Sequence, residues 1–224
     1  MFNRKTIKFL KELSSNNNRE WFADNKQRYE DEVRMPALTY IESMTQPMEK
    51  ISPFFVVSAK KVGGSLMRVH KDVRFSKDKT PYKTNVGIHF KHARGKDVHA
   101  PGFYLHIEPG EIFIAAGIWR PESSTLKNVR TLIDEYPDEW KNLVKKVTAK
   151  TGYEFGGTSL KRPPKGIDKE HPLLDDLKRK DFIVAKKLKL NEVCEKDFSK
   201  NSAKLFKVAS PLVNFVCDAD DLSF

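Results

Sequence analysis

The sequence predicts an α+β fold: a single domain, residues 1–224, with helices packed on one face of a mostly antiparallel sheet. The first observation is the alternation of side chains typical of half-buried strands, over residues 86–90, 103–107 and 112–118. The second is apolar spacing typical of amphipathic helices in the segments on either side of this region. The third is that the 224 residues contain no internal repeat and no long linker.

The first fifty residues are predicted to be helical. Apolar residues recur at helical spacing over residues 4–14, which predicts a first helix. Asn17, with Glu20 three residues later, resembles a capping box that opens a second helix. Residues 37–51 are predicted to form a third helix.

The middle of the chain is predicted to form the sheet. Residues 54–57 are rich in β-favouring side chains, and residues 66–70 alternate loosely. Together with the three clearly alternating segments, they predict three or four antiparallel strands with tight connections. Pro109 and Gly110 mark one of the turns.

The last third of the chain returns to helices, with one further strand. Two helices are predicted over residues 121–149 and a short one over residues 173–180. Residues 183–190 alternate lysine with apolar side chains, as a strand exposed on one face does. A final helix is predicted over residues 198–216, with Ser210-Pro211 as a cap where the helix stops and restarts.

Composition and charge exclude several classes of protein. No apolar run reaches 18 residues and no signal-type segment follows the N-terminus, so we expect a cytoplasmic protein that does not span a membrane. Two cysteines are too few for a disulfide scaffold or a zinc cluster. The sequence leaves the cofactor and the oligomeric state open.

The positive charge is concentrated in one region. The chain has 41 basic and 30 acidic residues, a net charge of +11. Residues 60–96 alone have 11 basic residues against two acids, or +9, which leaves +2 for the rest of the chain. Such a localised positive field attracts anions.

The basic segment, residues 68–83, is therefore the strongest candidate site. Its cations are the groups that bind phosphate and carboxylate oxygens, and arginine does so through two parallel hydrogen bonds. The candidate ligand-binding residues of this segment are Arg68, Lys71, Arg74, Asp78, Lys79 and Lys83.

Asp72, Asp78 and Tyr82 of the basic segment each have more than one interpretation. Asp72 and Asp78 either pair with the cations, or Asp72 acts as a base, or Asp72 together with Asp78 binds a divalent metal. Pairing is favoured, because two aspartates six residues apart match no defined ligand pattern, and we predict no metal site. Tyr82 either donates its hydroxyl in catalysis or anchors the loop by packing.

The face of the predicted sheet that points away from the helices is a second candidate site. Alternation places on it Gly87, His89, Tyr104, His106, Glu108, Phe113, Ala115, Gly117 and Trp119. We predict a shallow pocket floored by small residues and walled by polar ones, with His89 and Tyr104 as ligand-binding residues and His106 as a catalytic acid or base. The alternative is an ordinary solvated face. A stiff polar loop, residues 162–172, either covers this face or is a surface connection.

Several motifs span nearly the whole chain. The central one is Arg68-x-x-Lys71-Asp72-x-Arg74-Phe75-x-x-Asp78-Lys79-x-Pro81-Tyr82-Lys83. Others are Asn17-Asn-Arg19-x-Trp21-Phe22-x-x-Asn25, Trp119-x-Pro121 and Arg162-x-Pro164-Lys-Gly166. Together they resemble the signature of DUF2461, a bacterial family of unknown function.

The resemblance implies a single-domain bacterial protein of the cytoplasm, and it supplies no activity. It groups Arg19 and Asn25 with the basic segment, which adds both to the ligand-binding candidates. The family usually has arginine where this chain has Lys71. Lysine keeps the charge but loses the two-bond fork.

Three functions fit these observations. The first is a module that binds an anion bearing phosphate or carboxylate, with a nucleic-acid backbone as one version of that anion. The second is an enzyme acting on such a substrate, with Asp72 or His106 as acid or base and Tyr82 or Tyr104 as a donor. In the third, the motif is only an ion-pair network that braces the sheet.

Overall fold

A computed structural model describes residues 1–95 and 97–224. Within these residues a five-stranded antiparallel sheet runs in the order β1-β2-β3-β5-β4, which confirms the predicted α+β class. The strands are β1 (Val86–Lys91), β2 (Gly102–Glu108), β3 (Glu111–Ile118), β4 (Glu154–Phe155) and β5 (Phe182–Lys187).

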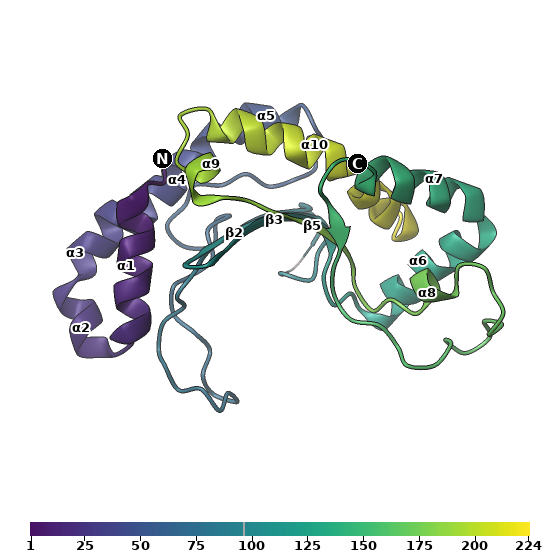
Figure 1. Cartoon of the computed structure of the whole chain (residues 1–224), viewed down its shortest axis with the longest axis horizontal. Coiled ribbons are helices and arrows are strands. Elements are labelled where there is room, and N and C mark those ends of the chain that lie inside the picture. The colour runs from purple at the N-terminus through teal and green to yellow at the C-terminus, as the bar shows by residue number, and fades with distance from the viewer. Residues whose placement is uncertain (96) are drawn as a thin grey trace.

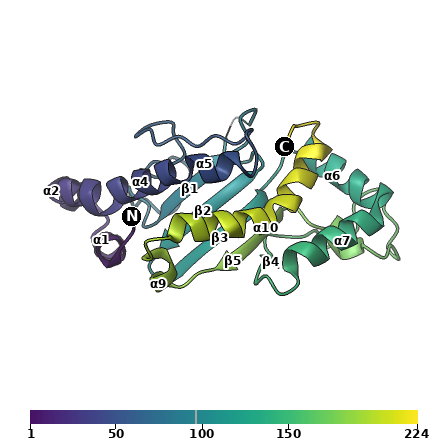
Figure 2. The same ribbon diagram turned by 90° about the horizontal axis from the view of Figure 1, so that it is seen from above.

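The helices surround one side and both ends of this sheet. The N-terminal ones are α1 (Arg4–Ser15), α2 (Arg19–Asp24), α3 (Lys26–Tyr29), the π-helical turn Glu30–Arg34, α4 (Met35–Ser43) and α5 (Thr45–Glu49). The later ones are α6 (Ser123–Glu135), α7 (Pro137–Thr148), α8 (Leu174–Leu177), α9 (Leu190–Val193) and α10 (Phe198–Ala219). The chain forms an arch, with α1–α3 at one end and α6–α8 at the other (Figure 1). Helices α4, α5 and α10 lie over the convex side of the sheet (Figure 2).

The core lies between the sheet and the helices above it. The Phe206 ring of α10 packs against Phe90 and Phe103, with ring centroids 6.2 and 5.3 Å apart. The Tyr40 ring of α4 stacks on Phe198, and its hydroxyl donates to Ser202 Oγ at 2.9 Å. In each central strand, every second side chain packs toward the helices. The side chains between them therefore face the hollow of the arch.

Residues 54–57 and 66–70 do not form the strands that their composition suggested. They make isolated bridges, Phe55 with His92 and Leu66 with Ile88. A third bridge joins His70 to Tyr82, so three residues (67–69) on one side oppose five (83–87) on the other and the regular ladder is interrupted. Tertiary pairing therefore overrides local β-propensity here.

Helix α10 is also longer than the sequence predicted. Pro211 has no N–H, so the carbonyl of Lys207 lacks its helical donor. The Ser210 hydroxyl donates to that carbonyl at 2.9 Å, and the helix continues without the predicted break. Among residues 1–95 and 97–224, no helix is both long enough and apolar enough to span a membrane.

Candidate functional site

A cavity of about 350 Å³ lies on the face of the sheet opposite the helices. Its location matches the face that strand alternation predicts. Its walls are less polar than predicted, because Met67, Val98 and Ile183 contribute apolar side chains from outside the central strands. The rings that line it are His89, Tyr104, His106, Phe113 and Trp119.

Two glycines let aromatic rings lie flat on the floor of this cavity. A Cβ atom at Gly87 would lie 2.7 Å from Tyr104 Oη, and one at Gly102 would lie 2.5 Å from His89 Nε2. Each ring therefore covers a glycine diagonally across the β1–β2 pair. The small side chain of Ala115 leaves open space beside these rings.

His89 is a neutral imidazole at the junction of two cavities. It lines the main cavity and a neighbouring one of about 240 Å³. Burial, and then the positive charge of Lys91, lower the pKa of His89 to about 4. Its ring nitrogens have no hydrogen-bond partner in the part of the chain that the structure describes. A ligand would therefore meet one donor and one acceptor at this point.

A carboxylate, an imidazole and a phenol form a hydrogen-bonded chain at the other end of the cavity. His106 Nε2 lies 3.2 Å from Glu108 Oε2, and His106 Nδ1 lies 3.2 Å from Tyr104 Oη. Burial, and then the charge of Glu108, raise the pKa of Tyr104 to about 12, so the phenol is protonated. This geometry brings together two of the predicted acid, base and donor groups, His106 and Tyr104.

Neighbouring side chains hold this chain in place. The His106 ring stacks on Phe113 at 4.7 Å with an interplanar angle of 10°. The Asn85 amide lies 3.4 Å from His106 Nδ1, and the Thr84 hydroxyl donates to Glu108 Oε1 at 2.6 Å. Sequence reasoning did not include Thr84 or Asn85, which precede β1 and show no pattern of their own.

Two ion pairs join charged residues of the basic segment to one another in an exposed loop. Arg74 donates twice to Asp72, at 2.7 and 3.0 Å, and Lys71 donates to Asp78 at 2.8 Å. Lys79 donates to the Val73 carbonyl at 3.0 Å, with its side chain still exposed. These contacts shape the loop itself, and none of these side chains lines either cavity.

Asp72 is poorly suited to be a base. Hydrogen bonds from the Arg74 side chain and backbone lower the pKa of Asp72 to about 2. A carboxylate with so low a pKa accepts a proton weakly near neutral pH. Both aspartates form ion pairs, Asp72 with Arg74 and Asp78 with Lys71, as the favoured interpretation from the sequence expected.

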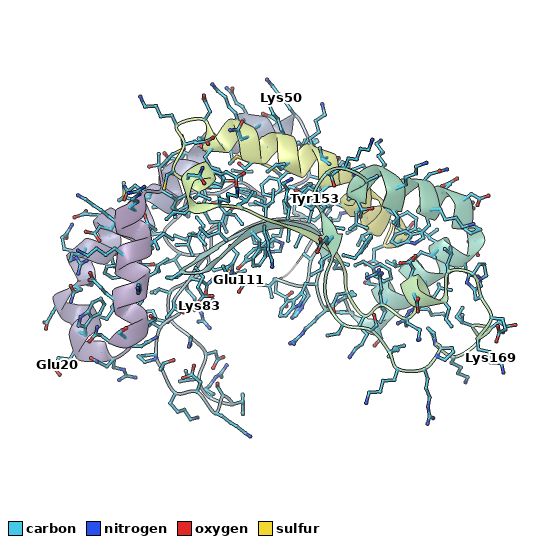
Figure 3. All side chains as sticks on the ribbon, in the orientation of Figure 1. Glu20, Lys50, Lys83, Glu111, Tyr153 and Lys169 are labelled. Carbon is cyan, nitrogen blue, oxygen red and sulfur yellow. The ribbon has the colours of Figure 1, made fainter. Side chains whose placement is uncertain are left out.

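Three cations of the basic segment, Arg68, Lys77 and Lys83, have no such partner in the described residues, and Lys77 is exposed in the loop. Among residues 1–95 and 97–224, no hydrogen bond or ion pair engages the side chain of Arg68 or Lys83. Lys83 is half-buried and lies in the hollow of the arch (Figure 3). Burial, and then the charge of Arg68, lower the pKa of the Lys83 ammonium. Two cations whose charges act on each other, with no carboxylate at ion-pair distance in the described residues, are an electrostatic sign of an anion site.

Tyr82 packs in the core and anchors the loop, which is the second of its two interpretations from the sequence. It is buried, and its ring stacks on Phe22 at 4.0 Å. Its backbone is fixed by Asn17, whose Nδ2 donates to the Tyr82 carbonyl at 2.9 Å and whose Oδ1 accepts from the Tyr82 amide at 3.0 Å. Asn18, rather than Asn17 as predicted, therefore caps α2. Asn17 is free for this role because the neighbouring Asn18 side chain reaches the Trp21 amide.

Arg19 and Asn25 lie at the two ends of α2. Arg19 is exposed, and Asn25 hydrogen-bonds to the Trp21 carbonyl and to Arg28. Neither side chain lines a cavity or contacts the basic segment within the described ranges. The motif of residues 17–25 does contact the basic segment, but through the side chain of Asn17, which hydrogen-bonds to the Tyr82 backbone.

The edge of the cavity near Trp119 depends on a buried carboxylate that sequence reasoning missed. Asp181 Oδ1 accepts from the Arg120 amide at 2.8 Å, and Asp181 Oδ2 accepts from the amide and hydroxyl of Thr158. These bonds join the end of β3 to the segment after β4. The polar loop 162–172 lies beside α6 instead, where His171 Nε2 is 3.1 Å from Asp134.

Comparison with known proteins gives one match and two negative results. A family model described as "Conserved hypothetical protein (DUF2461)" matches residues 5–215 of the 224-residue chain. No curated protein and no solved structure matches the chain.

Proposed function

Since the chain belongs to the DUF2461 family of conserved hypothetical proteins, a description that names no activity, we propose its function from the geometry of the site. The concave face of the sheet binds a small organic anion. The cavity receives the apolar, flat part of the ligand, and Lys83 with Arg68 binds its phosphate or carboxylate group. The observation that carries this proposal is that no hydrogen bond or ion pair engages the side chain of Arg68 or of the half-buried Lys83 in the described residues, although neither side chain lines the cavity itself.

The charge argument favours an anion. Moving an ammonium out of water costs free energy unless an opposite charge accompanies it. Lys83 is half-buried beside a second cation and has no carboxylate at ion-pair distance in the described residues. A bound phosphate or carboxylate would supply that charge, and Arg68 would contribute two parallel hydrogen bonds.

The cavity argument favours a flat organic body. A volume of about 350 Å³ lies at the lower end of small-molecule pockets, which span about 300–1,000 Å³. Rings on the floor offer stacking surfaces, and apolar side chains form the walls. His89 and Tyr104 add the few polar groups that fix the orientation of a ligand.

This proposal narrows the set of residues expected from the sequence. Lys71, Arg74, Asp78 and Lys79 already have partners inside the loop, so they have fewer donors and acceptors left for a ligand. Arg68, Lys83, His89 and Tyr104 remain as ligand-binding residues. If the protein is an enzyme, His106 and Tyr104 supply its acid and base in place of Asp72 and Tyr82.

Calorimetric titration with phenyl phosphate, benzoate, adenosine 5′-monophosphate and inorganic phosphate tests the proposal. We expect at least one aromatic anion to bind, and K83M to weaken its Kd at least about tenfold, or about 1.4 kcal/mol. Lys77, an exposed lysine of the same segment, provides the matched control, and K77M should leave the Kd unchanged. Equal losses in K83M and K77M, or no binding to the wild-type protein, would rule the proposal out.

A second candidate, binding to single-stranded nucleic acid, rests on one exposed ring. The Phe75 side chain is 95% exposed, and the Arg74 guanidinium lies 5.9 Å from the centre of its ring. An exposed aromatic among cations is the arrangement on which bases stack. Including a short oligonucleotide in the titrations tests this: F75A should weaken binding, whereas V62A, which truncates another exposed apolar side chain, should not.

A further inference from the structure

We propose that His106, Glu108 and Glu111 bind a first-row divalent transition-metal ion at the turn between β2 and β3. The site has one imidazole nitrogen and two carboxylates as ligands. It lies at the end of the cavity lined by His106. Sequence reasoning predicted no metal site, because it considered only the aspartates of the basic segment.

Strand geometry alone places the three side chains together. His106 and Glu108 are two residues apart in β2 and therefore share a face. Glu111 is the register partner of Glu108 across the tight turn, so it shares that face too. The three donor atoms lie within 4.8 Å of one another. An ion bonded at about 2.1 Å to each needs donors about 3–4 Å apart, which small side-chain rotations provide.

The two glutamates are unfavourable neighbours without a cation. Like charges directly opposite each other on paired strands destabilise a sheet. The chain contains 41 basic residues, yet in its described ranges no lysine or arginine lies at ion-pair distance from Glu108 or Glu111. The Glu111 side chain has neither a hydrogen bond nor an ion pair there, and it lies on the underside of the sheet (Figure 3). A divalent cation would remove this repulsion.

The ligands are held in position by neighbours that make no contact with the proposed ion. Stacking on Phe113 fixes the plane of His106, and Thr84 fixes one oxygen of Glu108. When His106 Nε2 faces the ion, its hydrogen lies on Nδ1, where Tyr104 Oη is 3.2 Å away and accepts it. Such hydrogen bonds to the second nitrogen are typical of histidines that bind metals.

The mixed ligand set indicates the class of metal. Imidazole suits zinc, copper, iron and nickel, whereas calcium and magnesium are bound almost entirely by oxygen. Three protein ligands leave a coordination position open, as in catalytic zinc sites. We expect the organic anion to occupy this open position, and that expectation rests on the proposed function. Binding of the metal by the three side chains does not rest on it.

The competing explanation is a simple hydrogen-bonded pair of His106 and Glu108. The protein contains a matched control, because His171 Nε2 lies 3.1 Å from Asp134 and forms the same kind of pair at the other end of the arch. In the described residues this second pair has no further carboxylate that completes a three-ligand group. A metal site therefore depends on Glu111, whereas a simple pair does not.

Equilibrium dialysis of the full-length, chelator-treated protein against Zn²⁺, followed by elemental analysis, tests the inference. We expect about one Zn²⁺ per chain, and E111Q and H106Q to weaken its Kd at least about tenfold. H171Q should bind as the wild type does. Co²⁺ should give visible d–d absorption that E111Q abolishes.

Two outcomes would overturn the inference: no saturable Zn²⁺ binding by the wild type, or the same affinity in E111Q as in the wild type. E111Q decides the question even if H106Q does not fold, because the exposed Glu111 side chain makes no contact on which the fold depends. Repeating the anion titrations with chelator present keeps the two proposals separate, because K83M acts on the anion and E111Q on the metal.

Discussion

At the scale of single residues, His89 shows how backbone packing sets a protonation state. Gly102 has no side chain, so the His89 ring lies directly over its backbone. The ring is thereby mostly buried without a hydrogen-bond partner in the described chain. Burial disfavours the charged imidazolium, the charge of Lys91 adds to this effect, and the carboxylate of Asp97 opposes it only in part. A sequence pattern identifies the face on which His89 lies, but not its burial.

This residue predicts a specific pH dependence of stability. The pKa of His89 is about 4 in the folded protein and about 6.5 when unfolded, so the unfolded chain binds the extra proton between these values. His89 therefore makes stability fall as pH falls from about 6.5 to 4, by at most about 1.4 kcal/mol per pH unit.

Urea unfolding of the wild type and H89Q at pH 7.5, 6.5, 5.5 and 4.5 checks this expectation. Carboxylates titrate in both proteins and cancel in the difference, which should shrink as the pH decreases. The same difference in stability at all four values would show that the folded state does not exclude the imidazolium.

At the scale of elements, α10 shows why a proline does not always end a helix. The sequence predicts a cap and restart at Pro211 because proline lacks a donor and clashes with the preceding turn. The structure supplies the missing donor from the adjacent Ser210 hydroxyl. The buried residues Ala209, Leu212 and Val213 keep the surrounding turns packed on the core. Helix propensity read from the sequence includes neither the Ser210 hydrogen bond nor this packing on the core.

The contribution of this hydroxyl should depend on the proline. S210A should cost about 0.5–1.5 kcal/mol of unfolding free energy, because the Lys207 carbonyl loses its donor. In a P211A background the backbone at this position regains its N–H, so the same change should cost much less. A double-mutant cycle of urea midpoints should therefore give a coupling energy of about 0.5–1 kcal/mol. S14A is the matched control, because Ser14 donates to the carbonyl of Lys11 in the same way without a following proline.

At the scale of the whole molecule, α10 connects the sheet to α5 above it and to the α6–α7 end of the arch. It packs on β3 and β5 and also contacts α5, α6 and α7. Its Phe206 ring lies against two rings of the sheet, Phe90 and Phe103. Because one helix joins the sheet to both groups of helices, we expect the chain to unfold as one cooperative unit.

Calorimetry of F206A measures this cooperativity. Truncating a fully buried phenylalanine costs roughly 3–5 kcal/mol, and at about 2–4 °C per kcal/mol this lowers Tm by roughly 6–20 °C. We expect one shifted transition with equal calorimetric and van't Hoff enthalpies. V208A, at an exposed position two residues away, should shift Tm little. Two separate transitions would mean that the ends fold independently.

The site as a whole was only partly predictable from the sequence. Alternation correctly placed His89, Tyr104 and His106 on one face, because strand parity is a local property. Charge counting found the basic segment, but it could not separate paired from unpaired cations. Lys71 pairs with Asp78 seven residues away, and Lys83 is left unpaired in the described chain; both facts depend on the path of the loop backbone. Glu111 joins His106 only through the β2–β3 register.

The two glycine–ring pairs on the cavity floor make this site adjustable by protein engineering. Y104A would uncover Gly87 and deepen the cavity by the volume of one ring, without any change in strand geometry. G87A would instead push the Tyr104 ring upward, because a Cβ atom there would lie 2.7 Å from its hydroxyl, and larger ligands would be excluded. Each glycine–ring pair thus limits the size of the ligand at its own part of the cavity floor. Changing a residue of one pair together with the ligand is therefore a route to altered specificity.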